Sequence, residues 1–139
     1  MLVIENIVEE LRKNPKAAIY VGGTLERYPS ITMTARFLSL FVETTVLHAC
    51  SDKETTFIDD IDKTYNHIRN ANFAIFIPYA DGHLNRDTIH EIVFARHTDT
   101  QTYILSSEDL KCIFNCLNSD YVYWPSSILK YAVKQLLKD

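Results

Sequence analysis

The sequence contains little glycine and proline, and it shows no excess of positive charge. Three glycines and four prolines in 139 residues exclude a collagen-like or low-complexity chain, so each glycine is expected to have a positional reason. Fourteen basic against eighteen acidic residues give a net charge of -4, with no basic stripe. This balance argues against nucleic acid or an anionic membrane as the main partner. A nucleotide pocket remains compatible with this net charge, because one arginine and a few backbone amides suffice to bind a phosphate.

Long apolar runs and an export signal are also missing. Residues 1–14 mix acids into their apolar positions, and no later segment reaches the roughly 18 apolar residues of a membrane span. We therefore expect a cytoplasmic protein without a membrane partner. The odd set of Cys50, Cys112 and Cys116 then indicates reduced thiols. Cys112 and Cys116 fit small core residues better than a metal pair, for which no further ligands are evident.

Apolar periodicity predicts helices alternating with strands in a chain of ordinary single-domain length. Helices are expected over 3–13, 30–42, 57–70, 88–97, 108–117 and 126–137. Strands are expected over 17–21, 44–49, 73–77 and 102–105, with 121–124 as a candidate fifth. This order predicts a single-domain α/β fold: a Rossmann-like parallel sheet of four to five strands with helices on both faces. The unbroken apolar run 73–77 is expected at its centre.

Two strand ends carry residue types suited to a ligand site, because open parallel sheets bind ligands at their carboxyl edge. The first is Tyr20 with Gly22, Gly23 and Thr24. Glycines let the backbone approach a ligand, although a Gly-Gly pair after a strand is also a common turn.

The second strand end is the polar loop 79–87 and the helix that follows it. Asp87 is either a helix cap or an acid of the site, and Glu91 is either a favourable acid in the first turns or a carboxylate aimed into the pocket. Arg86 either contacts phosphate or is a solvated loop residue. The five histidines show no ligand spacing, so no metal site is expected.

The same segments carry a pattern found in a known enzyme family. The first strand and loop of that family look like the run Ile19-Tyr20-Val21-Gly22-Gly23. Its next recognisable segment, in the order helix, small residue, Asp and strand, is similar to residues 68–78. Residues 85–95 resemble the signature Asp-x-Gly-Thr-x-x-Glu-x-Gly-x-Ala, with Thr88, Glu91 and Ala95 in register. Over roughly residues 17–105 the chain thus resembles the nucleoside 2-deoxyribosyltransferase family, whose wider group includes deoxynucleoside monophosphate N-glycosidases.

The resemblance implies covalent cleavage or transfer at the N-glycosidic bond of a nucleoside or nucleotide. Glu91 would be the nucleophile, Tyr20 would help to place it, and a second acid would protonate the leaving base. The family's own acid positions are not acids here, so Asp87 or Asp81 would have to substitute for them as the proton donor. The implied substrate-binding residues are Gly22, Gly23, Thr24, Asp81, Asn85, Arg86 and Thr88. No cofactor is expected.

A homo-oligomer is implied as well. Four aromatic residues near the C-terminus, Tyr121, Tyr123, Trp124 and Tyr131, are compatible with an interface, since aromatic side chains are enriched there, and equally with a core.

The departures from the family leave alternatives open. Thr64, Asn72 and Asn85 stand where the family has acids, and an amide cannot supply a proton as a carboxylic acid does. One alternative is a non-catalytic nucleotide-binding module, a sensor or a sequestering protein. Another is a TIR-like NAD glycohydrolase, because residues 67–95 also resemble the TIR pattern of a glutamate on the helix after a central strand. Two features favour the deoxyribosyltransferase interpretation over the TIR one: a helix precedes the first strand, and that strand ends in Gly22-Gly23.

Overall fold

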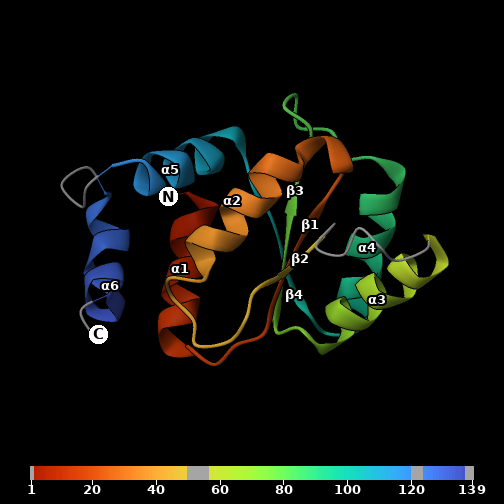
Figure 1. The fold of residues 1–139 in the computed structure, drawn as a ribbon, viewed down its shortest axis with the longest axis horizontal. Helices are drawn as coiled ribbons and strands as arrows, with labels where there is room; N and C mark the ends of the chain where they lie inside the picture. The colour runs from red at the N-terminus through yellow and green to blue at the C-terminus, as the bar shows by residue number, and fades with distance from the viewer. Residues whose placement is uncertain (1, 50–56, 120–123, 137–139) are drawn as a thin grey trace.

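A four-stranded parallel sheet lies between two layers of helices in the computed structural model (Figure 1). The structure describes residues 2–49, 57–119 and 124–136. The strands are β1 (Ile19–Gly23), β2 (Leu47–His48), β3 (Phe73–Ile77) and β4 (Gln101–Ile104). The helices are α1 (Val3–Lys13), α2 (Tyr28–Leu38), α3 (Phe57–Asn70), α4 (Arg86–His97), α5 (Ser107–Leu117) and α6 (Ser126–Leu136), with a short 3₁₀ turn η1 (Leu25–Arg27).

The strand order is β2-β1-β3-β4, and every pairing is parallel. β3 lies between β1 and β4, and all five of its residues are buried. The predicted Rossmann-like α/β fold with Phe73–Ile77 at its centre is therefore confirmed. The candidate fifth strand falls mostly on residues 121–123, which lie outside the described part of the chain.

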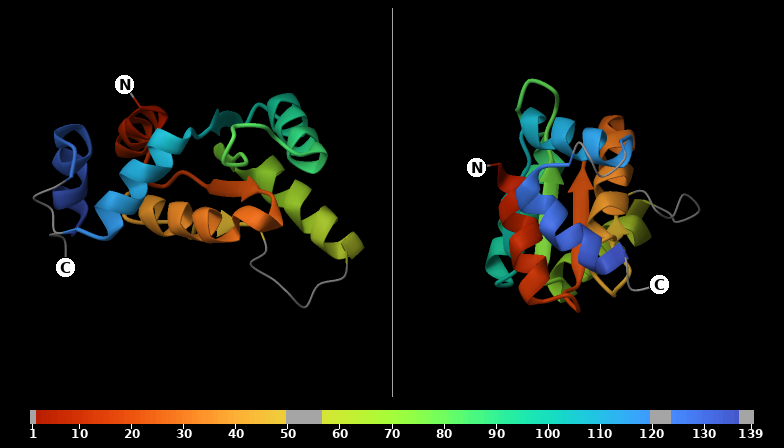
Figure 2. Two further views of the ribbon diagram at one scale, coloured as in Figure 1. Left: turned by 90° about the horizontal axis from the view of Figure 1, so that it is seen from above. Right: turned by 90° about the vertical axis from the view of Figure 1, so that its left-hand side faces the viewer.

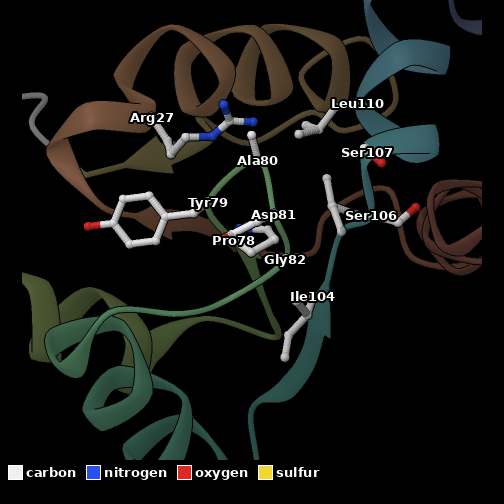
Figure 3. A pocket seen from close by; sticks show the side chains of 11 residues that line it. Arg27, Pro78, Tyr79, Ala80, Asp81, Gly82, Ile104, Ser106, Ser107 and Leu110 are labelled. Carbon is white, nitrogen blue, oxygen red and sulfur yellow. The ribbon is translucent and has the colours of Figure 1, made fainter.

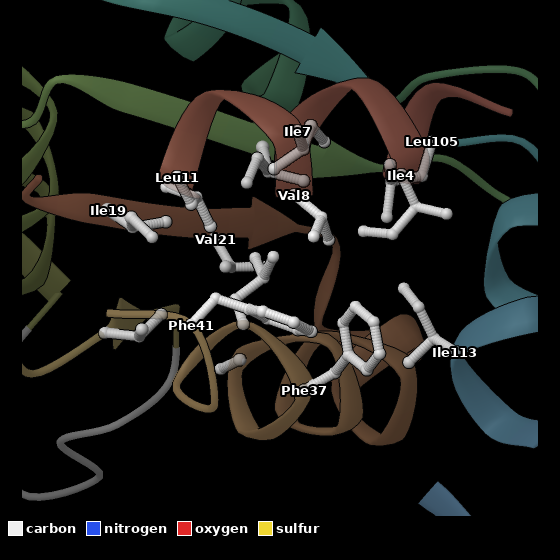
Figure 4. Close-up of a cluster of buried hydrophobic side chains, with 14 of the residues drawn as sticks. Ile4, Ile7, Val8, Leu11, Ile19, Val21, Phe37, Phe41, Leu105 and Ile113 are labelled. Carbon is white, nitrogen blue, oxygen red and sulfur yellow. The ribbon is translucent and has the colours of Figure 1, made fainter. Parts of the chain in front are cut away.

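The larger core lies between the sheet and the layer formed by α1, α2 and α5 (Figure 4). Apolar residues at helical spacing on α1 meet Ile19 and Val21 of β1 and the rings of Phe37 and Phe41. Burial of these side chains supplies most of the driving force for folding, since each large apolar side chain contributes about 1.5–3 kcal/mol.

A smaller core on the opposite face packs α3 and α4 against the sheet. Its strand residues are Tyr20, Ala74 and Phe76, which alternate with the residues that face the larger core. Ile68 of α3 and Ile92 of α4 cover them.

Several boundaries differ from those expected. The expected turn at Gly22 and Gly23 is the end of β1 itself, because both glycines pair with β3. The edge strand β2 is shorter than the expected 44–49; Thr44 instead donates its hydroxyl to the Ala17 carbonyl at 2.6 Å. α4 begins at Arg86 and not at 88, because Asn85 caps it.

Both ends of the described chain lie on the same side of the molecule, where α6 packs against α1 (Figure 2). The buried Asp109 joins α1 to α5, since its carboxylate accepts the Ile4 backbone N–H at 2.9 Å and the Ser106 N–H at 2.8 Å. Among the described residues, no helix has the length and apolar character needed to cross a bilayer.

Candidate functional site

The sheet changes its direction of winding between β1 and β3. The chain leaves β1 toward the edge strand β2, whereas it leaves β3 toward β4 on the other side. The two connections depart over opposite faces, α2 on one and α4 on the other (Figure 1). Such a switch point opens a crevice at the carboxyl ends of the two strands, which is where open α/β sheets bind ligands.

A hydrogen bond at this switch point joins β1 to α4. The Tyr20 hydroxyl donates to Oε1 of Glu91 at 3.1 Å. Tyr20 is almost fully buried, and its ring meets that of Phe76 edge to face at 6.2 Å. A buried hydroxyl aimed at a carboxylate fixes the orientation of that carboxylate, because leaving either group unpaired would cost free energy. Two residues that are 71 positions apart are thus held in a defined geometry.

Gly22 makes room for the Tyr20 ring. A Cβ at Gly22 would lie 2.7 Å from Cε2 of Tyr20 and 3.1 Å from its hydroxyl oxygen. The ring therefore lies along β1 over Gly22, and its hydroxyl reaches the carboxyl end of the strand. Gly23 has a different reason to be glycine: its φ is +152°, and a Cβ there would lie 2.7 Å from the Ile77 carbonyl oxygen.

The carboxyl group of Glu91 is electrostatically unusual. Burial raises its pKa from 4.5 to about 7, the Asp87 charge adds to this rise, and the hydrogen bond from Tyr20 opposes it. A carboxyl group with such a pKa exchanges a proton readily at neutral pH. Strongly shifted acids in a crevice are typical of functional sites, although structural networks also produce them.

Further polar groups lie at this edge of the sheet. Asp87 lies one helical turn before Glu91 on the same face of α4. Burial, followed by the charges of Glu91 and Asp87, raises the pKa of Tyr65 on α3. The hydroxyl groups of Thr24 and Thr88 are buried and have no hydrogen-bond partner among the described residues. Because buried hydroxyls are normally paired, these two are suited to donate to, or accept from, a bound ligand.

The loop after β3 forms a tight turn stabilised by its own side chains. The Gly82 N–H donates to the Tyr79 carbonyl at 2.8 Å, and Gly82 has a φ of +92°. The rings of Tyr79 and His83 stack at 4.3 Å. Asp81 accepts hydrogen bonds from the backbone N–H and ring of His83, which hold its pKa below the usual range. Asp81 is therefore a poor proton donor at neutral pH.

Two asparagines, at the ends of segments that precede β3 and α4, make structural hydrogen bonds. Asn85 caps α4 by accepting the Thr88 N–H at 2.9 Å, so the cap is Asn85 and not Asp87. Asn72 accepts the Ala18 N–H at 2.8 Å and thereby ties the start of β3 to the segment before β1. Arg86 and Asp87 lie in the first turn of α4, where Asp87 is exposed. The sequence-predicted residues thus come together at one edge of the sheet, with Asp81 on an exposed loop tip.

A pocket of about 360 Å³ lies at the same edge, over the ends of β3 and β4 (Figure 3). Its walls come from η1, the loop after β3 and the start of α5. The lining residues are Arg27, Pro78, Tyr79, Ala80, Asp81, Gly82, Ile104, Leu105, Ser106, Ser107 and Leu110. Of these, the sequence pattern indicated only Asp81 and its neighbours in the polar loop.

Sequence reasoning therefore missed Arg27, Ser106 and Ser107. A signal existed for the serines: Ser106 stands three residues before Asp109, a capping pattern directly after the strand β4. In a parallel sheet that position shares an edge with the ends of β1 and β3. Arg27 offered no comparable pattern, because it reaches the pocket only through η1.

Comparisons with known proteins do not assign the chain to a family: no family model matches it, and neither does any curated protein or solved structure. Within the described ranges, no three His, Cys, Asp or Glu side chains gather into a metal-binding group.

Proposed function

We propose that this protein cleaves, or transfers across, the N-glycosidic bond of a nucleoside or nucleotide, with Glu91 as the covalent nucleophile. The observation that carries the proposal is the 3.1 Å hydrogen bond from the buried Tyr20 hydroxyl to the Glu91 carboxylate at the switch point of the sheet. The hydrogen bond favours the ionised carboxylate and fixes its orientation. The resemblance at Tyr20, Thr88 and Glu91 supports the same assignment.

The chemistry follows the double displacement of retaining glycosidases. A Glu91 oxygen bonds to the anomeric carbon while the carbon–nitrogen bond breaks, and the bonding electron pair leaves with the base. Asp87 is the proposed proton donor to that base, since it lies on the same face of α4. Water or a second base then attacks the anomeric carbon and gives its proton to the Asp87 carboxylate, while the departing ester oxygen restores the Glu91 carboxylate.

The buried hydroxyls of Thr24 and Thr88 are the proposed contacts for sugar hydroxyls. Each lies at the carboxyl edge of the sheet, Thr24 directly after β1 and Thr88 three residues before Glu91. A sugar offers both donors and acceptors, so it can satisfy a threonine hydroxyl in either role.

The decisive experiment measures base release from a panel of nucleosides, nucleotides and NAD by wild type and by Glu91→Gln. The variant keeps the shape of the side chain and removes its charge, so we expect it to fold normally and to lose at least about 10³-fold in rate. Glu9→Gln, the same change on the exposed face of α1, is the matched control and should retain wild-type activity.

One result of this experiment would contradict the assignment of Glu91 as the nucleophile. If Glu91→Gln still releases base from the substrate of the wild-type protein, Glu91 is not the nucleophile. A mass increase on Glu91 after trapping with a slow 2-fluoro sugar analogue would independently identify the covalent step.

A second candidate is a binding module that does not turn its ligand over. Its support is that Asn72 and Asn85, at family acid positions, are used in backbone hydrogen bonds. Under this alternative, wild type binds one member of the panel and releases base from none of them.

A further inference from the structure

The pocket over β3 and β4 has features that the proposed chemistry at Glu91 does not use. Its volume of about 360 Å³ lies within the range of about 300–1,000 Å³ typical of small-molecule sites. Glu91 and Tyr20 are not among its lining residues. A ligand group bound there would therefore be a different chemical part, or a different molecule, from the sugar at Glu91.

The unusual group in this pocket is Arg27. Its Nε atom is buried, and it has no hydrogen-bond partner among the described residues; nor does any described acid form an ion pair with Arg27. Figure 3 shows its guanidinium extending over Ala80 toward Leu110 and α5. Burying a donor of a permanently charged group without an acceptor is costly, so the position favours an incoming anion.

The far wall of the pocket offers further donors. Ser107 opens α5. The Ser106 hydroxyl caps the Asp109 N–H at 3.2 Å, so the first-turn N–H groups that lack an intrahelical acceptor are those of Ser107 and Glu108. Within the described part of the chain, the Ser107 hydroxyl makes a single long hydrogen bond, of 3.4 Å, to Glu108. The nearby Asp109 carboxylate is occupied by the N–H groups of Ile4 and Ser106, and that of Asp81 by His83. The two carboxylates are therefore engaged with donors of their own.

We propose that this pocket binds a phosphate group, held by the Arg27 guanidinium on one side and by the start of α5 on the other. A phosphate presents several acceptor oxygens, which matches a planar guanidinium fork together with helix N–H groups and a hydroxyl. Its source is either the substrate itself, a nucleotide, or a separate phosphate ligand. The first source rests on the proposed function, whereas the second does not.

Binding is measured by calorimetry at fixed low salt. The probes are inorganic phosphate, the four common 2′-deoxynucleoside 5′-monophosphates and their nucleosides. Arg27→Gln should weaken phosphate or monophosphate binding by about tenfold to a hundredfold, the effect expected for losing a charge-assisted contact. Nucleoside binding should be unchanged.

Two further variants keep the test decisive. Ser107→Glu places a negative charge at the first position of α5, which the helix dipole tolerates, yet it repels a bound anion. It should weaken phosphate binding as Arg27→Gln does, with an unchanged melting temperature. Arg36→Gln removes an exposed arginine from α2 and is the matched control with unaltered binding.

The outcomes separate the two sources. Monophosphates that bind more tightly than nucleosides, with the difference lost in Arg27→Gln and Ser107→Glu, support a substrate phosphate. Inorganic phosphate that binds with the same dependence, while monophosphates do not compete, supports a separate ligand. If wild type binds no phosphate probe, or if neither variant weakens binding, the proposal is overturned. Base release from nucleosides is unaffected by that failure, so the proposed function is tested independently.

Discussion

At the scale of single residues, the ionisation of Glu91 links the structure to measurable pH effects. If Glu91 is the nucleophile, it must be ionised in the free enzyme, and its pKa is about 7. We therefore expect kcat/KM to rise with pH between about 6 and 8 and to level off above that range. A pH–rate profile on the active substrate measures this directly. A flat profile across that range would contradict the assignment.

Tyr20 should control the midpoint of that profile. Its hydrogen bond lowers the pKa of Glu91, so Tyr20→Phe should move the midpoint to higher pH and reduce activity at pH 7. The control variant is Tyr103→Phe on β4. It removes a hydroxyl that accepts a hydrogen bond from Gln101, and it should leave the midpoint of the pH–rate profile unchanged. Equal midpoints for wild type and Tyr20→Phe would show that the hydroxyl does not tune Glu91.

Glu91 should also destabilise the folded protein at high pH. The unfolded chain releases the Glu91 proton near its ordinary pKa of 4.5, whereas the folded chain keeps it until about 7. The folded state therefore binds more protons in this window, and the free energy of unfolding falls as pH rises from about 4.5 to about 7. That separation corresponds to about 3 kcal/mol.

Glu91→Gln removes this penalty. Urea unfolding should show the variant more stable than wild type at pH 8, by up to about 3 kcal/mol, and little different at pH 4.5. Because this measurement needs no substrate, it tests the burial of Glu91 apart from its role in the reaction. A variant that is less stable than wild type at pH 8 would refute the shifted ionisation.

At the scale of secondary-structure elements, the packing of Gly22 at the end of β1 affects the position of the Tyr20 ring and therefore the Glu91 carboxylate. Gly22→Ala places a methyl group against the Tyr20 ring, because the added carbon would lie 2.7 Å from Cε2 of that ring, which Phe76 confines. We expect a loss of about 1–3 kcal/mol in stability and a shifted Glu91 titration, because the ring must move. Carboxylate chemical shifts from NMR would follow that titration.

Gly82→Ala is the matched control. Gly82 has open space around its Cα, so its replacement meets only the backbone cost of a φ of +92°. It should lower stability modestly and leave the titration of Glu91 unchanged. If Gly22→Ala also leaves that titration unchanged, the glycine is not required for the Tyr20–Glu91 geometry.

At the scale of the whole molecule, Asp109 holds the N-terminal helix to the rest of the fold. Asp109→Ala leaves the Ile4 and Ser106 N–H groups without their acceptor, at about 1–3 kcal/mol each. Chemical unfolding should therefore show a loss of several kcal/mol, with a smaller loss for Asp109→Asn. The exposed neighbour variant Glu108→Ala should change stability little; a similar loss in both alanine variants would contradict the anchoring role.

The expected homo-oligomer stays a prediction, and one of its supports has weakened. Trp124 is buried and lies 6.1 Å from the Phe37 ring, and Tyr131 contacts the Arg12 guanidinium, so both are used within the chain. Tyr121 and Tyr123 lie outside the described residues. Light scattering at tens of micromolar should show a multimer, and a monomer alone would contradict the prediction.

Local pattern was enough to predict the architecture. The helices Val3–Lys13 and Phe57–Asn70 and the strand Phe73–Ile77 match their expected bounds, because strong periodicity or an unbroken apolar run leaves few alternatives. Parallel pairing then followed from the alternation of helices and strands. The short β2 was the least predictable element, since an edge strand is decided by hydrogen bonds to its neighbours and not by its own composition.

The sequence by itself determined the fold class, the central strand and the edge of the sheet at which Tyr20 and Glu91 lie. Only the tertiary structure decided that Tyr20 donates to Glu91, that Gly22 is small to admit a ring, and that Arg27 joins α5 around a pocket. The physical reason is the separation along the sequence over which each interaction acts. Helix and strand formation depend on neighbours along the chain, whereas hydrogen bonds and burial at the site depend on side chains separated by scores of residues.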